Sequence, residues 1–401
     1  MDGPVRCNSQ SRPFVTWLCG LFFVVGVLIA GQVSDACPFC DTPSITFSEQ
    51  VAQSQAVVLV KWAGAEKPDP FNFEPGSCTY QIVSRYRQNE ATPQPGEQVT
   101  IPFYQSGKPG DSFWMLGTET DGKLNWAPPV SMSKECWEYV THAPDRKAEP
   151  GTRLRYYLKH LEHADSEIAI DAYGEFAGAN YADLLQLTKE LPREKLLEWL
   201  LNPETVPSRR GLYGLMLGLC GTPEDAARIE PILLENPEGA RLGVDGMMAG
   251  YVLINGAPGL QKLVDSKLKN RDANPSESFA VLQMLRFLGE YATHAVPRDQ
   301  LLAAMRTLLD HPQYASFAAI DLARWSDWGA TKLLVERYGS EPFGDSEGKQ
   351  AVIRFLTQAA AVSDEQAGMS LEDVKLARES LAKYRQTDPE IVRIVERLRF
   401  D

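Results

Sequence analysis

The chain has 401 residues and carries 53 Asp and Glu against 40 Lys and Arg, which gives a formal net charge of −13. This charge would repel nucleic-acid phosphates and anionic membrane surfaces, so the composition argues against both as partners. A hydrophobic fraction of 44% supports packed cores, and the length allows two domains, or one small domain followed by a repeat array.

The first 36 residues have the plan of an export signal. Two arginines precede an apolar run at 14–30 (FVTWLCGLFFVVGVLIA), and the small residues Ser34 and Ala36 stand at positions −3 and −1 of a cleavage site before Cys37. The run also reaches the roughly 17 residues that can span a bilayer, so an uncleaved N-terminal anchor is an alternative. A lipidated Cys37 is a third possibility for this segment. In each case we expect the body of the chain outside the cytoplasm, as a periplasmic, cell-envelope or secreted protein.

Cysteine usage supports this placement. Five cysteines follow the predicted cleavage site, and cysteines in an oxidising compartment are expected to pair. Cys220 lies in an apolar segment, where a buried thiol packs as a hydrophobe, so we expect it to be left over. The disulfide candidates are therefore Cys37, Cys40, Cys78 and Cys136, all within one N-terminal domain.

Residues 37–142 are predicted to form a small β-domain. A short helical turn is expected at 48–53, and short runs of β-branched or alternating residues predict strands. A hairpin turn is predicted at Thr120-Asp-Gly122. The expected strands are 57–62, 78–87, 97–103, 113–116 and 123–126, with a closing segment at 136–139. Short strands joined by turns are typical of a small β-barrel or sandwich.

The order of Cys37-Pro-Phe-Cys40, a helical turn and the run AVVLVKW resembles the start of netrin-like OB-barrel domains, found in tissue inhibitors of metalloproteases. The resemblance covers about residues 37–141. It differs in having two residues rather than one between the first cysteines, and in lacking a third cysteine pair. It implies pairing of Cys37 with Cys78 and of Cys40 with Cys136.

The same resemblance implies a role for the mature N-terminus. In those inhibitors the free α-amino group and the carbonyl of the first cysteine chelate the catalytic zinc of the target protease. After cleavage behind Ala36, this wedge role would belong to Cys37.

After a charged linker at 143–151, helical periodicity predicts an α-helical domain at 152–401. Leu154, Tyr157, Leu158 and Leu161 show the spacing of one helix face. The expected helix pairs are 192–201 with 208–220, 223–235 with 240–254, 259–269 with 275–292 and 297–311 with 314–326, followed by 331–338, 349–361, 371–384 and 388–400. Paired helices with short loops resemble HEAT-like repeats, and a compact irregular helical domain is the alternative.

Two motifs suggest chemistry. Cys37-Pro-Phe-Cys40 has thiol-disulfide spacing, but no predicted strand precedes it, which favours structural cystines over redox catalysis. His160 and His163, beside Glu162 and Asp165, could present a metal-binding face, but without a third ligand a solvated helix face is favoured.

Two further groups of residues are expected to serve packing. Glycines at 211, 214, 218 and 221 lack the Lys-Ser/Thr of a phosphate loop, so their spacing favours close helix contact. The aromatic residues Trp325, Trp328 and Tyr338 are interpreted as packing between repeats rather than as a ligand platform.

No catalytic, metal or cofactor motif was identified, and no cofactor is expected. The sequence therefore predicts an exported, non-enzymatic binding or scaffolding protein that uses a helical-repeat surface to recognise a partner protein. The alternatives are an enzyme whose pocket is not visible in the sequence, and a metalloprotease-inhibitor-like module acting through Cys37.

Overall fold

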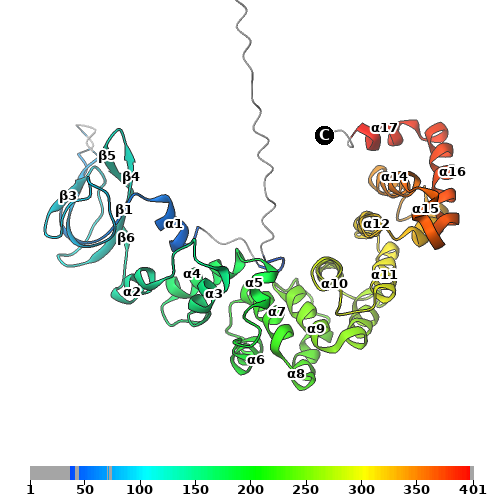
Figure 1. Ribbon diagram of the computed structural model, residues 1–401, viewed down its shortest axis with the longest axis horizontal. Coiled ribbons are helices and arrows are strands. Elements are labelled where there is room, and N and C mark those ends of the chain that lie inside the picture. Colours follow the sequence, from blue (N-terminus) through cyan, green and yellow to red (C-terminus); the bar gives the residue numbers. More distant parts are fainter. Residues whose placement is uncertain (1–36, 41–44, 70, 72–74, 398–401) are drawn as a thin grey trace, which may run out of the picture. The chain divides into compact units, whose positions relative to one another are not determined.

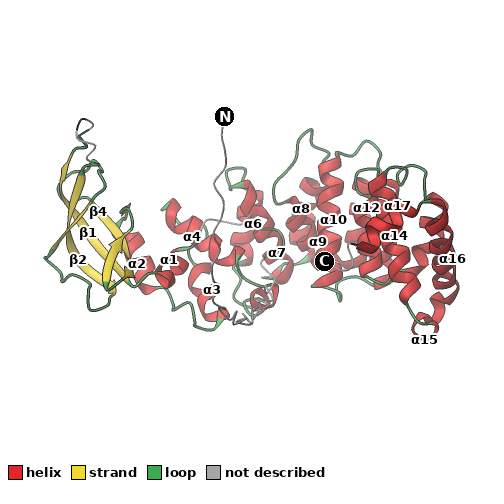
Figure 2. Cartoon of the chain, turned by 90° about the horizontal axis from the view of Figure 1, so that it is seen from above, coloured by secondary structure: helices red, strands yellow, loops and turns green. Residues whose placement is uncertain are grey.

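The computed structural model describes residues 37–40, 45–69, 71 and 75–397 (Figure 1). The predicted signal or anchor, at 1–36, lies outside the described residues. Within them, no helix combines the length and apolar character that crossing a bilayer requires. The fold combines one small antiparallel sheet with many helices, and Figure 2 shows the strands gathered in that sheet.

The strands of the sheet lie where the sequence predicted them. Its strands run in the order β3-β2-β1-β4-β5, all antiparallel, and β6 pairs with β4. Asp121 and Gly122 join β4 to β5 with φ values of 51° and 74°, the left-handed conformation that a tight hairpin requires at both positions. The strands are β1 (Ala56–Glu66), β2 (Ser77–Arg87), β3 (Gln98–Ile101), β4 (Ser112–Thr120), β5 (Lys123–Trp126) and β6 (Val130–Ser131).

The described sheet is not a closed barrel. Its end strands, β3 and β5, have four residues each and pair with β2 and β4 but not with each other. Short edge strands are a common way of ending a sheet without inviting further pairing. The sequence thus predicted the strands, but the closure implied by the resemblance to OB barrels is absent from them.

Alternation along β1 and β4 gives the sheet two buried faces. Val58 and Met115 belong to a core made only of residues 58–115, whereas Val57 and Trp114 belong to a larger core that continues into the helices. Because successive strand residues point to opposite faces, one pair of strands supplies both cores. The predicted domain division at 143–151 stays a prediction.

The closing segment at 136–139 is helical, so its assignment to the β-domain's strands was wrong. It lies in α2 (Lys134–His142), and the Ser133 side chain accepts a hydrogen bond from the Cys136 amide at 2.9 Å. A serine in this position satisfies an otherwise unpaired amide of the first helical turn. This cap outweighs the strand tendency of the aromatic residues that follow.

Most of the regular structure in the rest of the described chain is helical. The short turn predicted at 48–53 is α1 (Phe47–Gln53). Beyond α2 the helices are α3 (Pro150–Leu158), α4 (Ser166–Ala177), α5 (Tyr181–Leu185), α6 (Arg193–Leu201), α7 (Arg210–Cys220), α8 (Pro223–Leu234), α9 (Val244–Leu263), α10 (Pro275–Glu290), α11 (Arg298–Thr307), α12 (Ala315–Arg324), α13 (Thr331–Arg337), α14 (Ser346–Ala361), α15 (Asp364–Ala367), α16 (Leu371–Thr387) and α17 (Pro389–Arg397). Most match the predicted segments within a few residues.

Two departures have physical causes. The helices predicted at 240–254 and 259–269 are joined in α9, where Gly256 at φ 60° makes a kink instead of a loop. The predicted segments also omit α4, in which every residue from Ile168 to Ala177 except Ile170 is buried. A helix buried around most of its circumference lacks the periodic signal of an amphipathic helix.

Successive helices pack on one another. α6 contacts α7, and α9 contacts α7, α8 and α10. Further along the chain, α14 contacts both α12 and α16. The contact between α7 and α9 depends on glycine. A Cβ on Gly214 would collide with the backbone of Met247, and one on Gly250 with the carbonyl of Gly214. The interpretation of the α7 glycines as a close helix contact is confirmed.

Candidate functional site

The disulfide pairing implied by the resemblance is wrong. Cys37 and Cys40 pair with each other, whereas Cys78, Cys136 and Cys220 are free. Cys78 is buried in the sheet core, and Cys136 lies on α2 in the other core. The Cys37–Cys40 turn packs against helices instead of the sheet, which keeps these cysteines away from the partners that the resemblance supplied.

The same turn also holds the two atoms of Cys37 that the zinc-chelating wedge would use, and the wedge itself stays a prediction. The Cys37 amide donates to the Ala177 carbonyl at 3.1 Å, and the Cys37 carbonyl accepts from the Cys40 amide at 3.3 Å. Phe39 is buried, with its ring centroid 5.0 Å from that of Phe287 on α10. Both atoms that would chelate zinc are therefore engaged inside the chain.

The two histidines of the candidate metal face make other contacts. The His160 ring lies 5.0 Å from Tyr139 and 4.9 Å from Tyr156, and burial lowers its pKa. The Glu162 carboxylate accepts from Arg209 at 2.9 Å. Among the described residues, no group of three or more His, Cys, Asp or Glu side chains could hold a metal ion.

The three aromatic residues that were predicted to serve packing, Trp325, Trp328 and Tyr338, do pack against other helices. Trp328 is buried with its ring 5.6 Å from Phe355, and Tyr338 stacks on Tyr384 at 3.9 Å. Trp325 covers Gly289, where a Cβ would collide with the indole.

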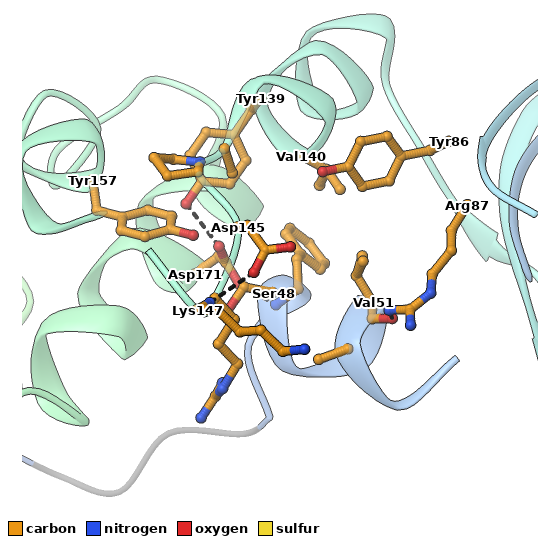
Figure 3. Close-up of a pocket in the computed structure, with 15 residues that line it drawn as sticks. Ser48, Val51, Tyr86, Arg87, Tyr139, Val140, Asp145, Lys147, Tyr157 and Asp171 are labelled. Carbon is orange, nitrogen blue, oxygen red and sulfur yellow. Dashed lines mark hydrogen bonds between the residues drawn. The ribbon is translucent and has the colours of Figure 1, made fainter. Parts of the chain in front are cut away.

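A cleft that the sequence did not predict lies where the sheet meets the helices, and we call it the seam cleft (Figure 3). Its volume is about 670 Å³. Its walls come from α1, the end of β2, α2, the loop at 143–147, α3 and α4. It is lined by Phe47, Ser48, Val51, Ala52, Tyr86, Arg87, Tyr139, Val140, Ala143, Pro144, Asp145, Arg146, Lys147, Tyr157 and Asp171.

Asp171 on α4 ties two elements together at the floor of this cleft. Its carboxylate accepts a hydrogen bond from the Phe47 amide at 2.6 Å and another from the Tyr139 hydroxyl at 2.7 Å. Burial raises the pKa of Asp171 to about 6, and the two hydrogen bonds oppose that rise. The start of α1 and the middle of α2 are thus fixed to one buried carboxyl group.

Glu175, one helical turn after Asp171, joins α4 to α1 and α3. It accepts from the Ser48 hydroxyl at 2.5 Å and from the Arg153 guanidinium of α3 at 2.5 Å. Both side chains of this ion pair are largely buried. A buried carboxylate with a cation and a hydroxyl donor has its charge compensated, so Glu175 is a structural anchor.

Tyr157 differs from these side chains. It is 1% exposed, and its hydroxyl has no close hydrogen-bond partner among the described residues, with the Ser48 side chain as its nearby polar neighbour. Figure 3 shows this hydroxyl directed toward Tyr139 and Asp171. Burial raises the pKa of Tyr157, so the hydroxyl keeps its proton and can both donate and accept.

The outer part of the cleft carries three cationic side chains and one carboxylate, Asp145. Arg87 donates to the Val51 carbonyl at 2.9 Å, and Arg146 pairs with Glu49 at 2.8 Å. Lys147 is exposed, and no ion pair of its ammonium group occurs among the described residues. Three cationic side chains therefore line one opening in a chain of net charge −13.

The carboxylates at this site are engaged in hydrogen bonds within the chain. Asp171 and Glu175 are each held by two donors. The sequence analysis missed both carboxylates. Their spacing of four residues in the otherwise apolar segment 168–177 was the available signal, because charged residues inside a buried helix require partners.

A second surface lies on α10 and α12, and we call Phe279, Arg286, Tyr314 and Phe317 the aromatic strip. Phe279 and Phe317 are 42% and 40% exposed. The Phe279 ring lies 5.8 Å from Tyr314, and the Arg286 guanidinium lies 5.7 Å from the centre of Phe317. Arg286 is held in place by Asp321 at 2.7 Å. Partly exposed aromatic side chains thus lie on both α10 and α12, and Arg286 links the two helices.

Comparison with known proteins gives no relative. No family model matches the chain, and neither a curated protein nor a solved structure matches it.

Proposed function

We propose that this chain is an exported, non-enzymatic binding or scaffolding protein that recognises a partner protein through its helices. The helical part acts as a HEAT-like array, and the sheet is an open relative of the OB plan. The observation that supports recognition is the aromatic strip, where Phe279 and Phe317 are exposed next to Arg286.

Aromatic residues and arginine carry a large share of the energy at protein interfaces. An exposed aromatic ring loses unfavourable contact with water when a partner covers it. The strip also spans α10 and α12, which the ion pair between Arg286 and Asp321 joins, so one partner segment can contact both helices. The seam cleft supports the same choice, because its carboxylates are fixed in structural hydrogen bonds rather than arranged for a reaction.

The test is capture from cell-envelope extracts with the full chain as bait. The strip variant Phe279→Ala with Phe317→Ala is compared with wild type and with Phe71→Ala, since Phe71 is 91% exposed elsewhere. We expect a discrete partner with wild type and with Phe71→Ala, and a loss of at least tenfold with the strip variant.

Equal recovery by all three baits would contradict the proposal, provided that circular dichroism shows folded proteins. Recovery of no partner, together with turnover of a small substrate by the purified chain, would favour an enzyme instead.

A further inference from the structure

The seam cleft has features that a structural joint does not require. Asp171 and Glu175 already hold α1, α2 and α3 together, yet a cleft of about 670 Å³ remains beside them. This volume lies within the range of about 300–1,000 Å³ that is usual for small-molecule sites. The floor is fixed by hydrogen bonds, so its shape does not depend on a ligand.

One buried polar group without a close hydrogen-bond partner lies at the floor of the cleft. The Tyr157 hydroxyl is buried among the described residues and is directed toward the Asp171 carboxyl group (Figure 3). Leaving such a group unpaired is costly, and native structures usually satisfy it with protein, water or ligand. A ligand hydroxyl fits here, because it can accept from Tyr157 and donate to a carboxylate oxygen that has a spare lone pair.

The walls and opening define the rest of the ligand. Phe47, Val51 and Val140 supply apolar surface, which suits an aromatic or aliphatic body. At the opening, Arg87 contacts only a neutral carbonyl among the described residues, and Lys147 has no ion pair there. Both can attract a carboxylate.

We propose that the seam cleft binds a small organic anion that has an apolar body, a hydroxyl group at its inner end and a carboxylate at its outer end. The inner hydroxyl meets Tyr157 and Asp171, and the outer carboxylate meets Arg87 and Lys147. This site is separate from the aromatic strip, so the inference does not rest on partner binding.

The experiment uses calorimetry on the full chain with three matched ligands. These are 3-(4-hydroxyphenyl)propanoate, 3-phenylpropanoate without the hydroxyl, and 3-(4-hydroxyphenyl)propanamide without the charge. We expect saturable binding of the first at one site, and affinity lower by about fivefold for each of the others, because each lacks one of the two polar contacts.

Variants assign the contacts. Tyr157→Phe should weaken the hydroxylated acid about fivefold and leave 3-phenylpropanoate unchanged. Tyr181→Phe is the control, because Tyr181 also has a buried hydroxyl without a described partner but lies outside the cleft. Lys147→Gln should weaken both acids but not the amide, and the exposed Lys123→Gln should weaken neither.

No saturable binding of the hydroxylated acid to the wild type would overturn the proposal. Equal affinities for all three ligands, or equal effects of Tyr157→Phe and Tyr181→Phe, would do the same. If Tyr157→Phe does not fold, the ratio of the three wild-type affinities decides.

Discussion

Two contacts between helices in this chain are built from opposite chemistry. Around Asp171 and Glu175, elements are joined by buried charges and hydrogen bonds. Between α7 and α9, Gly214 and Gly250 let backbones touch with no side chain between them. The first contact depends on protonation and leaves space for a ligand, whereas the second depends on shape alone. Substitutions should separate the two.

The largest effect is expected at the glycine contact. Gly250→Ala places a Cβ against the Gly214 carbonyl, so α9 must move away from α7. We expect the free energy of unfolding to fall by more than about 3 kcal/mol, measured by denaturant titration. Gly239→Ala is the matched control, because its Cβ would meet no atom within 4 Å. Similar effects of both substitutions would contradict a contact based on shape.

Breaking the polar contact at Glu175 should lower the free energy of unfolding slightly less than the glycine substitution does. Arg153→Met leaves Glu175 buried without its cation, and we expect a loss of about 3 kcal/mol in the free energy of unfolding. Lys134→Ala removes the exposed pair with Glu138 and should change stability by less than about 1 kcal/mol. If the two variants are equally stable, the polar contact is not an anchor.

The polar contact should also respond to pH. The pKa of Asp171 is raised from 3.8 to about 6 by burial, so folding favours its protonated form. Its stabilising contribution is therefore complete below about pH 4 and is lost as the pH rises through 6, by about 3 kcal/mol at most. Because other charged groups lie close to Asp171, among them Glu49 and Glu175, the measured quantity is the difference in unfolding free energy between wild type and Asp171→Asn. A difference that does not change between pH 4 and pH 7 would contradict a raised pKa.

The smallest effect concerns the N-terminal turn that packs beside the glycine contact. A Cβ on Gly211 would approach the Phe39 carbonyl, so this turn continues the close packing of α7. Replacing Cys37 and Cys40 by serine opens a four-residue loop and should lower the free energy of unfolding by about 2 kcal/mol. Cys220→Ser, at a free thiol, should change it by less than about 0.5 kcal/mol. Equal losses would show that the disulfide adds nothing.

Local patterns predicted most elements of the fold, but not the contacts between distant parts. The hairpin at Asp121-Gly122 and the glycine spacing of α7 were visible because the turn and the helix repeat act over a few residues. The seam cleft combines residues from 47 to 171, so no short window contains it. The cysteine pairing failed for the same reason, because the position of Phe39 against Phe287 decides where the first cysteines lie.

Site-specific photo-crosslinking in cells tests the proposed partner recognition most directly. A benzophenone amino acid replaces Phe279 or Phe317 in the aromatic strip, and Phe71 in the matched control. The account predicts a discrete crosslinked species from both strip positions and none from position 71. Absence of a crosslink at both strip positions, or the same species from position 71, would contradict recognition through the aromatic strip.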